Sequence, residues 1–163
     1  MSDMVEGRII EITEQGGPEV MQVRSFNFSD PEEGEVLIDQ KALGMNFLDV
    51  YHRSGAYPLS TPSGIGTEAA GIVAKVGAGV TEFKEGDRVA YGGGTPGGYA
   101  DYRNVSATRI VPIPNNVTNE QAATSLMKGM TVELSLIHIS EPTRRYAIGV
   151  WGGGGGKTRG GGG

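Results

Sequence analysis

Cysteine is absent from the 163-residue chain, and histidine occurs only twice, as His52 and His138. Without cysteine the chain has no disulfide, no thiolate nucleophile and no cysteine ligand for zinc. Two histidines also argue against a histidine-rich metal centre. A thiol mechanism is therefore excluded, and a bound catalytic metal is not expected.

Long hydrophobic runs are missing as well. No apolar stretch approaches the roughly 18 residues that a membrane-spanning helix needs. The N-terminal MSDMVEGRIIEITEQ has no basic region followed by an apolar one, which a secretory signal peptide requires. We therefore expect a cytoplasmic protein without a membrane partner.

Positive charge is scarce in most of the chain. Residues 1–133 hold 18 acidic and 10 basic side chains, a balance of −8, whereas residues 134–163 hold one acidic and four basic, a balance of +3. Nucleic-acid binding rests largely on neutralising phosphates. The acidic body therefore argues against a nucleic-acid partner.

Short strand-like segments between glycines and prolines fill the first 115 residues. The candidate strands cover residues 7–13, 20–26, 35–46, 66–80, 84–92, 98–105 and 107–114. Many short strands at this spacing predict a barrel or sandwich, and the glycines of residues 66–80 predict a strand that bends or admits another backbone. Residues 46–55 fit a short helix with Phe47, Val50 and Tyr51 on one side. Thr118 and Gln121 form a capping-box pattern that begins a second helix. The expected fold is mainly β with short helices.

Several segments follow one another in an order typical of one enzyme group. They are GMNFLDVYHRSGAYP (residues 44–58), PSGIGTEAAGIV (62–73), VGAGV (76–80), KEGDRVAY (84–91), GGYADY (97–102) and QAATSLMKGMT (121–131). The series, over about residues 7–133, resembles the zinc-independent quinone oxidoreductases of the medium-chain dehydrogenase/reductase superfamily. The resemblance implies a GroES-like catalytic domain over residues 1–117. It further implies that residues 118–133 lead into a Rossmann domain that is cut off, and that the full-length parent is a homodimer.

Two departures separate the sequence from the zinc-dependent branch of that superfamily. Asn46 stands where that branch has a zinc-binding cysteine, and Thr67-Glu68 stands where it has a His-Glu pair. Residues 86–94 also run on without a four-cysteine lobe. Hydride transfer belongs to the nicotinamide, and a quinone accepts hydride readily, so no Lewis acid is needed.

The resemblance also implies site residues and ligands. The cofactor is NADPH, the substrate a quinone or enone, and no metal is bound. The expected cofactor contacts are Asn46, Phe47, Leu48, Asp49, Val50, Tyr51 and Thr131. Asn46, Tyr57 and Thr67 would be catalytic, with the Asn46 amide donating to a carbonyl oxygen and Tyr57 stacking and hydrogen bonding. Two other functions stay open, an enoyl or alkenal reductase of the same superfamily and a stand-alone β module without catalysis.

Structural interpretations exist for the same residues. Asn46 could simply cap a helix, and Tyr51 could be a half-buried core residue. Asp49 and Arg53, four residues apart, could form an ordinary helical ion pair. Glu68 is expected to order the local backbone, and His52 to be a solvated surface residue.

Residues 134–163 differ in character from everything before them. LSLIHISEPTR (residues 134–144) resembles the translation of a transposase-type sequencing-library adapter, and ten glycines follow from Gly149 onward. A phosphate-binding loop would need a preceding strand and a following helix, and a flexible linker would have nothing to join. We therefore expect an artefactual tail over residues 134–163, disordered from Gly149.

Overall fold

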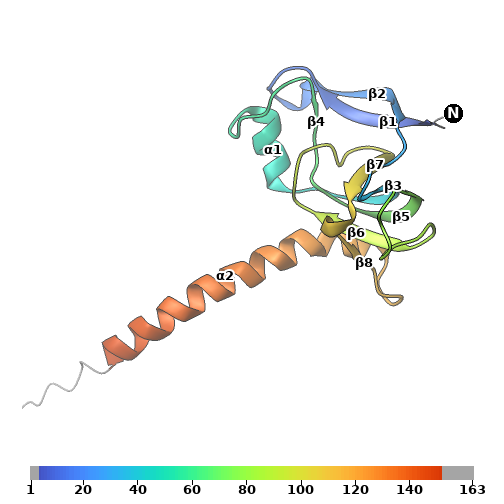
Figure 1. Ribbon diagram of the computed structural model, residues 1–163. Coiled ribbons are helices and arrows are strands. Elements are labelled where there is room, and N and C mark those ends of the chain that lie inside the picture. The colour runs from blue at the N-terminus through green and yellow to red at the C-terminus, as the bar shows by residue number, and fades with distance from the viewer. Residues whose placement is uncertain (1–3, 152–163) are drawn as a thin grey trace, which may run out of the picture. The chain divides into compact units, whose positions relative to one another are not determined.

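The computed structural model describes the backbone of residues 4–151 and the side chains of residues 4–135 (Figure 1). The chain divides into two compact units, and the boundary along the chain lies between Met127 and Lys128. The described part of the first unit contains two antiparallel sheets and the short helix α1 (Phe47–Ser54). The prediction of a mainly β fold with short helices is therefore confirmed.

The smaller sheet has the strand order β2-β1-β4. Its strands are β1 (Val5–Ile12), β2 (Met21–Phe28) and β4 (Ser63–Gly64). β1 and β2 pair along their full length, and the short 3-10 helix Pro18–Val20 leads into β2. β4 was not expected, because two residues are too short to show any periodicity.

The larger sheet has the order β7-β3-β5-β6-β8. Its strands are β3 (Glu35–Gly44), β5 (Glu68–Val76), β6 (Arg88–Gly92), β7 (Tyr102–Ser106) and β8 (Ile110–Pro112). The register between β3 and β5 shifts twice, once between Gln40 and Ala42. A Cβ at Gly71 would overlap the backbone of Asp39 at this point. The predicted close approach of another backbone to this strand is therefore confirmed.

The predicted strand over residues 84–92 is shorter than expected. Lys84 donates its backbone N–H to Asp87 Oδ2 at 3.0 Å, and Asp87 donates its own to the Lys84 carbonyl at 3.1 Å. Gly86 lies between them with φ +89°. An aspartate that bonds to the local backbone competes with strand pairing, so β6 begins only at Arg88. The predicted strand over residues 107–114 is also shorter than expected, because the 3-10 helix Ala107–Arg109 precedes β8.

Side chains pack on both faces of β5 and β6. Ala69 and Val89 face a cluster with Val36 and Ile38, whereas their neighbours Ala70 and Ala90 face Ala123 of helix α2 (Asn119–Trp151) on the opposite side. Successive strand residues point to opposite faces. Burial on both faces explains why this stretch is small and apolar instead of alternating.

Helix α2 begins with the predicted capping box. The Thr118 N–H donates to the Gln121 side chain at 2.9 Å, and the Gln121 N–H donates to the Thr118 hydroxyl at 3.2 Å. The helix extends to Trp151, so residues 149–151, within the stretch that we expected to be disordered, are helical. Residues 134–148 hold no glycine, but Pro142 lies among them, and proline costs about 3 kcal/mol in a helix interior. Composition therefore does not account for this part of the helix. Residues 152–163 lie outside the described part. None of the described helices is long and apolar enough to cross a membrane.

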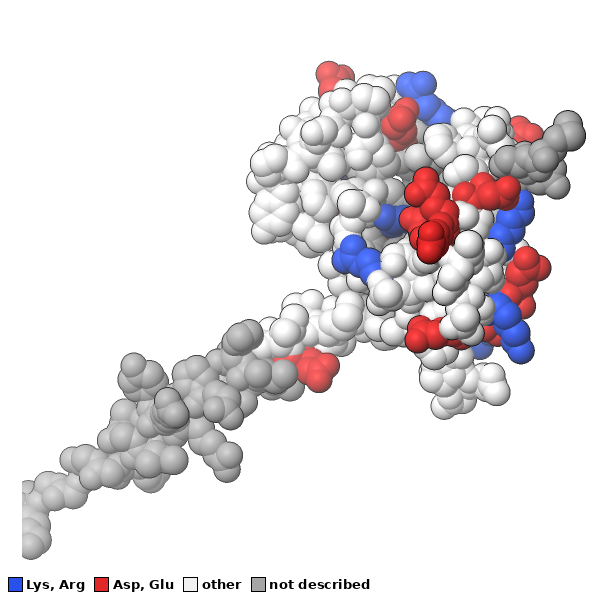
Figure 2. All heavy atoms as spheres, in the orientation of Figure 1, with Lys and Arg blue, Asp and Glu red and all other residues white. Residues whose placement is uncertain are grey.

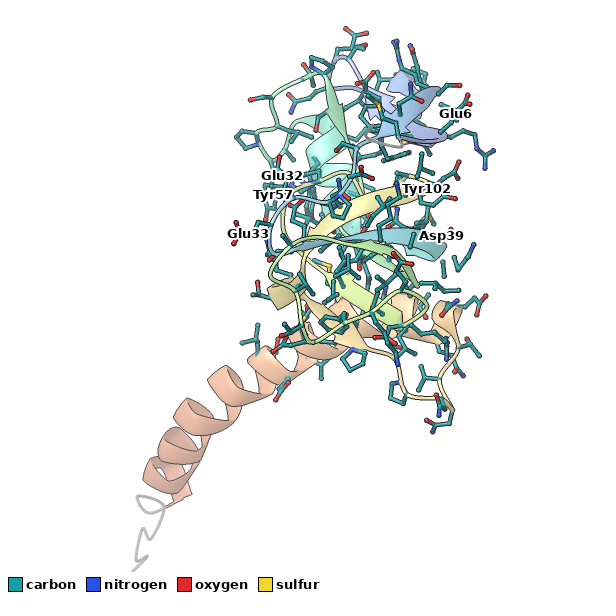
Figure 3. All side chains as sticks on the ribbon, turned by 45° about the vertical axis from the view of Figure 1, so that its right-hand side comes forward. Glu6, Glu32, Glu33, Asp39, Tyr57 and Tyr102 are labelled. Carbon is teal, nitrogen blue, oxygen red and sulfur yellow. The ribbon has the colours of Figure 1, made fainter. Side chains whose placement is uncertain are left out.

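Charged side chains of both signs mix on the surface of the first unit. On the face shown in Figure 2, Lys and Arg side chains lie singly among Asp and Glu. Asp39 on β3 and Tyr102 on β7 are partners in register and lie close together in Figure 3. Lys41, two residues further along β3, pairs with Asp39 at 2.7 Å. Arg8, Arg24 and Lys75 likewise each pair with a carboxylate.

Candidate functional site

The end of β3 and the start of α1 are brought close to helix α2. A Cβ at Gly44 would overlap the Ala123 carbonyl, so only glycine allows this approach of the two backbones. Two residues later Asn46 has extended backbone angles (φ −128°, ψ 151°) and is the N-cap of α1. The interpretation of Asn46 as a helix cap is therefore confirmed, and it leaves a ligand role open.

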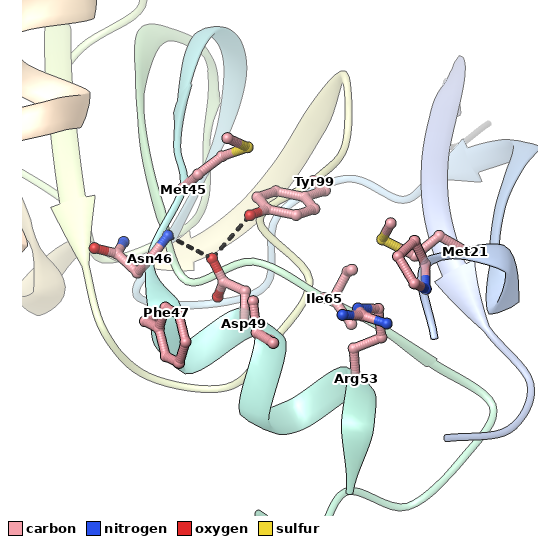
Figure 4. Close-up of a pocket in the computed structure, with 10 residues that line it drawn as sticks. Met21, Met45, Asn46, Phe47, Asp49, Arg53, Ile65 and Tyr99 are labelled. Atoms are coloured by element: carbon pink, nitrogen blue, oxygen red, sulfur yellow. Dashed lines mark hydrogen bonds between the residues drawn. The ribbon is translucent and has the colours of Figure 1, made fainter. Parts of the chain in front are cut away.

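Asp49 connects three parts of the site. Its side chain is 4% exposed, and its Oδ2 accepts the Asn46 backbone N–H at 2.9 Å and the Tyr99 hydroxyl at 2.8 Å (Figure 4). Its Oδ1 faces the Thr67 hydroxyl at 3.4 Å. A carboxylate at this position of a first helical turn is stabilised by the helix N-terminus. Asp49 therefore fixes the entry of α1 from inside.

The alternative ion pair between Asp49 and Arg53 is wrong. No such pair is found among the described side chains, and the Arg53 guanidinium donates instead to the Gly16 carbonyl at 2.7 Å. The inward turn of Asp49 toward Tyr99 explains why the four-residue spacing does not produce the pair. Arg53 thereby ties α1 to the turn between β1 and β2.

Tyr99 is the main site residue that the sequence did not reveal. Burial, and then the hydrogen bond to Asp49 and its negative charge, raise the pKa of the Tyr99 hydroxyl above its ordinary value. The hydroxyl therefore stays protonated and remains a donor to Asp49. Its sequence signal is its place in GGYADY (residues 97–102), one of the segments that carry the family resemblance, although this segment was expected to be an ordinary strand.

Glu68 is fully buried at the start of β5. Its Oε2 accepts the Asn46 side-chain N–H at 2.7 Å, and its Oε1 accepts the backbone N–H of Met127 at 2.7 Å. The expectation that Glu68 orders nearby backbone is confirmed. The structure adds that the same carboxylate holds the side chain of Asn46.

A cavity of about 400 Å³ lies beside the first turn of α1 (Figure 4). Its walls are mainly apolar, with the Asn46, Asp49, Arg53 and Tyr99 side chains among them. The apolar lining comes from Pro18, Met21, Met45, Phe47, Val50 and Ile65. Concave apolar sites with a few placed polar groups are typical of small-molecule binding.

Aromatic side chains cover the outer side of α1. Phe47 is 70% exposed, Tyr57 50% and Tyr51 38%. The Phe47 and Tyr51 ring centroids lie 5.1 Å apart, and those of Tyr51 and Tyr57 5.2 Å apart. Tyr57 is thus exposed as expected, and Tyr51 is not a core residue. The three rings form an exposed aromatic face of this unit.

His52 differs from its expected role. It is only partly exposed, and its Nδ1 is buried with no hydrogen-bond partner among the described residues. Its ring lies 6.2 Å from that of Tyr57. The prediction of a solvated surface histidine is wrong, because the imidazole is only partly exposed and its Nδ1 is buried.

The predicted site residues fall into separate groups. Asn46 and Asp49 join the fully buried Thr67 in one network, with Leu48 partly buried on the same turn. Phe47, Val50, Tyr51 and Tyr57 are exposed around α1. Thr131 is exposed in the second unit. Within the described residues, no three His, Asp or Glu side chains converge as a metal-binding group.

Comparison with known proteins identifies the domain. The family described as alcohol dehydrogenase GroES-like domain matches residues 32–115. The chain belongs to this family. The matched residues of this GroES-like domain include the end of β3, all of α1 and the Asn46, Asp49, Glu68 and Tyr99 cluster.

Among individual proteins, the chain is similar to quinone oxidoreductases. Quinone oxidoreductase 1 of Escherichia coli is 50% identical over 124 residues, which cover 76% of this chain and 38% of that protein. The crystal structure of Escherichia coli quinone oxidoreductase complexed with NADPH superposes with a TM-score of 0.78 at 48% identity, over 79% of this chain and 40% of that one. A mycobacterial protein solved with NADPH gives a TM-score of 0.75 at 41% identity, over 79% and 40% of the two chains. The chain thus spans about two fifths of the length of the relatives it matches.

Proposed function

We propose that this GroES-like domain serves an NADPH-dependent oxidoreductase that transfers hydride to a quinone. The observation that carries the proposal is the exposed aromatic face of Phe47, Tyr51 and Tyr57 beside the Asn46 network. This arrangement lies in the 124-residue part of the chain whose sequence is 50% identical to that of Escherichia coli quinone oxidoreductase 1. A contiguous group of exposed aromatic rings is unusual unless it meets a ligand or partner.

The residues present fit a nicotinamide ring. The exposed side of α1 offers flat and aliphatic contacts from Phe47, Val50 and Tyr51, and Asn46 at its first turn offers a polar carboxamide. An aromatic ring with a polar edge is recognised by such a combination. When bound, NADPH supplies the hydride; the residues of this chain supply its orientation.

The remaining aromatic groups suit a planar acceptor. Tyr51 and Tyr57 present rings for stacking and hydroxyl groups that can donate to a carbonyl oxygen. Reduction of a quinone by hydride leaves an oxyanion that takes one proton to become the hydroquinone. A tyrosine hydroxyl close to that oxygen can stabilise the charge until water delivers the proton.

Two proteins test the proposal. The first is the 163-residue chain, and the second is a chimera in which residues 1–131 replace the matching segment of Escherichia coli quinone oxidoreductase 1. We expect the chimera to oxidise NADPH with a small quinone and the chain alone to show little turnover. A folded chimera that binds NADPH without quinone reduction would contradict the proposal and support a binding module.

Reduction of a carbon–carbon double bond is the second candidate. A solved structure of 2-haloacrylate reductase superposes with a TM-score of 0.71 at 32% identity, over 79% of this chain. The same chimera, assayed with a quinone and with an α,β-unsaturated acid or thioester, separates the two. A higher kcat/KM for the unsaturated compound would favour this second function.

A further inference from the structure

Both oxygens of the buried Glu68 carboxylate meet hydrogen-bond donors. One is the side-chain N–H of Asn46 on α1, and the other is the backbone N–H of Met127 on α2, each at 2.7 Å. In a regular α-helix the Met127 N–H would point to the carbonyl of residue 123. Glu68 therefore accepts one hydrogen bond from the backbone of α2 and one from the Asn46 side chain at the same time.

Only a carboxylate accepts from both partners while the Asn46 amide keeps its present orientation. A glutamine has the same shape but carries an acceptor at one end and a donor at the other. In place of Glu68 it would set a donor against either Met127 or Asn46, and Asn46 could accept from that donor only by turning its amide over. An aspartate is one methylene shorter and could not reach both. The polarity of the pair, and not its shape alone, thus fixes which way the Asn46 amide is turned.

Asn46 is held from a second direction as well. Its backbone N–H donates to Asp49 at 2.9 Å, and Asp49 is in turn fixed by Tyr99. The main chain and the side chain of Asn46 are thus each bound to a different buried carboxylate. Side chains whose rotamers are locked in this way hold ligand-facing groups within narrow limits.

We propose that Glu68 is a positioning residue that sets the orientation of the Asn46 carboxamide for the ligand. The inference rests on the proposed function, because it assumes that Asn46 faces the nicotinamide or the substrate. It goes further in assigning to a fully buried residue, without ligand contact, control over binding at α1. Its effect passes through Asn46 and is separate from its contribution to folding.

The test uses the complete 163-residue chain, labelled with ¹⁵N, and reduced nicotinamide mononucleotide as the probe. We expect E68Q to shift the Asn46 side-chain and Met127 backbone resonances together and to weaken probe binding about tenfold, the cost of one misplaced hydrogen bond. The matched control is Q121A, which removes half of the α2 capping box without touching Asn46. It should lower the urea midpoint and leave probe affinity unchanged.

A double variant keeps the test valid if E68Q unfolds. In N46D/E68Q the donor and the acceptor exchange places, so the hydrogen bonds to one another and to Met127 can form again. We expect its urea midpoint to recover and its probe affinity to stay low, because the amide at position 46 has become a carboxylate. Full recovery of affinity would overturn the proposal.

Three further outcomes distinguish a failure of this inference from a failure of the proposed function. Equal probe affinity of folded E68Q and the wild-type chain would overturn the role of Glu68 while leaving the proposed function intact. Equal weakening by Q121A would also overturn it, since any loss of stability would then suffice. Absence of any probe-induced shift between residues 46 and 51 in the wild-type chain would instead refute the proposed nicotinamide site.

Discussion

Asp49 and Glu68 are two carboxylates removed from water within one small region of the domain. Burial of a charge is costly unless hydrogen bonds replace the lost hydration. Asp49 receives a hydroxyl and a backbone N–H, and Glu68 receives an amide and a backbone N–H. These bonds make single atoms of neighbouring residues important for the stability of the site.

Removal of the Tyr99 hydroxyl should weaken this region measurably. Y99F leaves the buried Asp49 carboxylate without one of its donors, and we expect a loss of about 1–3 kcal/mol in the free energy of unfolding. Urea unfolding at neutral pH measures it. The matched control is Y102F, where the ring packs on Phe28 near the surface; a similar loss there would contradict the specific role of Tyr99.

The same variant should change the alkaline stability of the chain. The pKa of Tyr99 is raised in the folded state, chiefly by burial. Its stabilising contribution is therefore complete below about pH 10, where tyrosines ionise in the unfolded chain, and is lost as pH rises further. Urea midpoints measured between neutral and alkaline pH should fall less steeply for Y99F than for the wild-type chain.

At the scale of elements, the contact between β3 and α2 depends on the absence of a side chain. Gly44 is buried at the end of β3, directly against the Ala123 carbonyl. Gly129 lies within α2 with no atom near the position of a Cβ. The two glycines therefore respond differently to the same substitution.

The pair G44A and G129A tests this difference. G44A should destabilise the first unit by about 1–3 kcal/mol, because the added methyl group must displace backbone. G129A should leave stability unchanged or raise it by up to about 1 kcal/mol, because alanine favours a helix over glycine. Thermal unfolding followed by circular dichroism measures both; destabilisation of equal size would contradict the close approach at Gly44.

Elements with a local signal were predictable from the sequence, and the orientation of side chains was not. Alternation and turn residues located the longer strands, and the capping box at Thr118 located the start of α2. The two-residue β4 and the turn before β6 have too few residues for a periodic signal. The inward direction of Asp49 depends on Tyr99, fifty residues further along the chain, and no local pattern carries that information.

At the scale of the whole molecule, the apolar clusters are built from the first unit. Among the described side chains, the four clusters extend no further along the chain than Leu126. The packing that holds the site thus comes from residues 5–126. None of the described core side chains belongs to residues 134–144, the segment that resembles a translated adapter.

Removal of residues 134–163 should accordingly leave the first unit as stable as before. We expect the Tm of the shortened chain to stay within about 2 °C of the complete one, far less than the loss of a core side chain would cause. Differential scanning calorimetry of both proteins measures it. A decrease of many degrees would show that the segment contributes packing that its sequence does not predict.

The two donors at Glu68 also restrict how this domain can evolve. A change from amide to carboxylate at Asn46 brings two acceptors face to face unless Glu68 changes to glutamine as well. The residue types at the two positions are therefore linked, although twenty-two residues separate them in the chain. Natural variants of the domain with an aspartate at position 46 should therefore carry glutamine at position 68, and aspartate at position 46 opposite Glu68 should be rare.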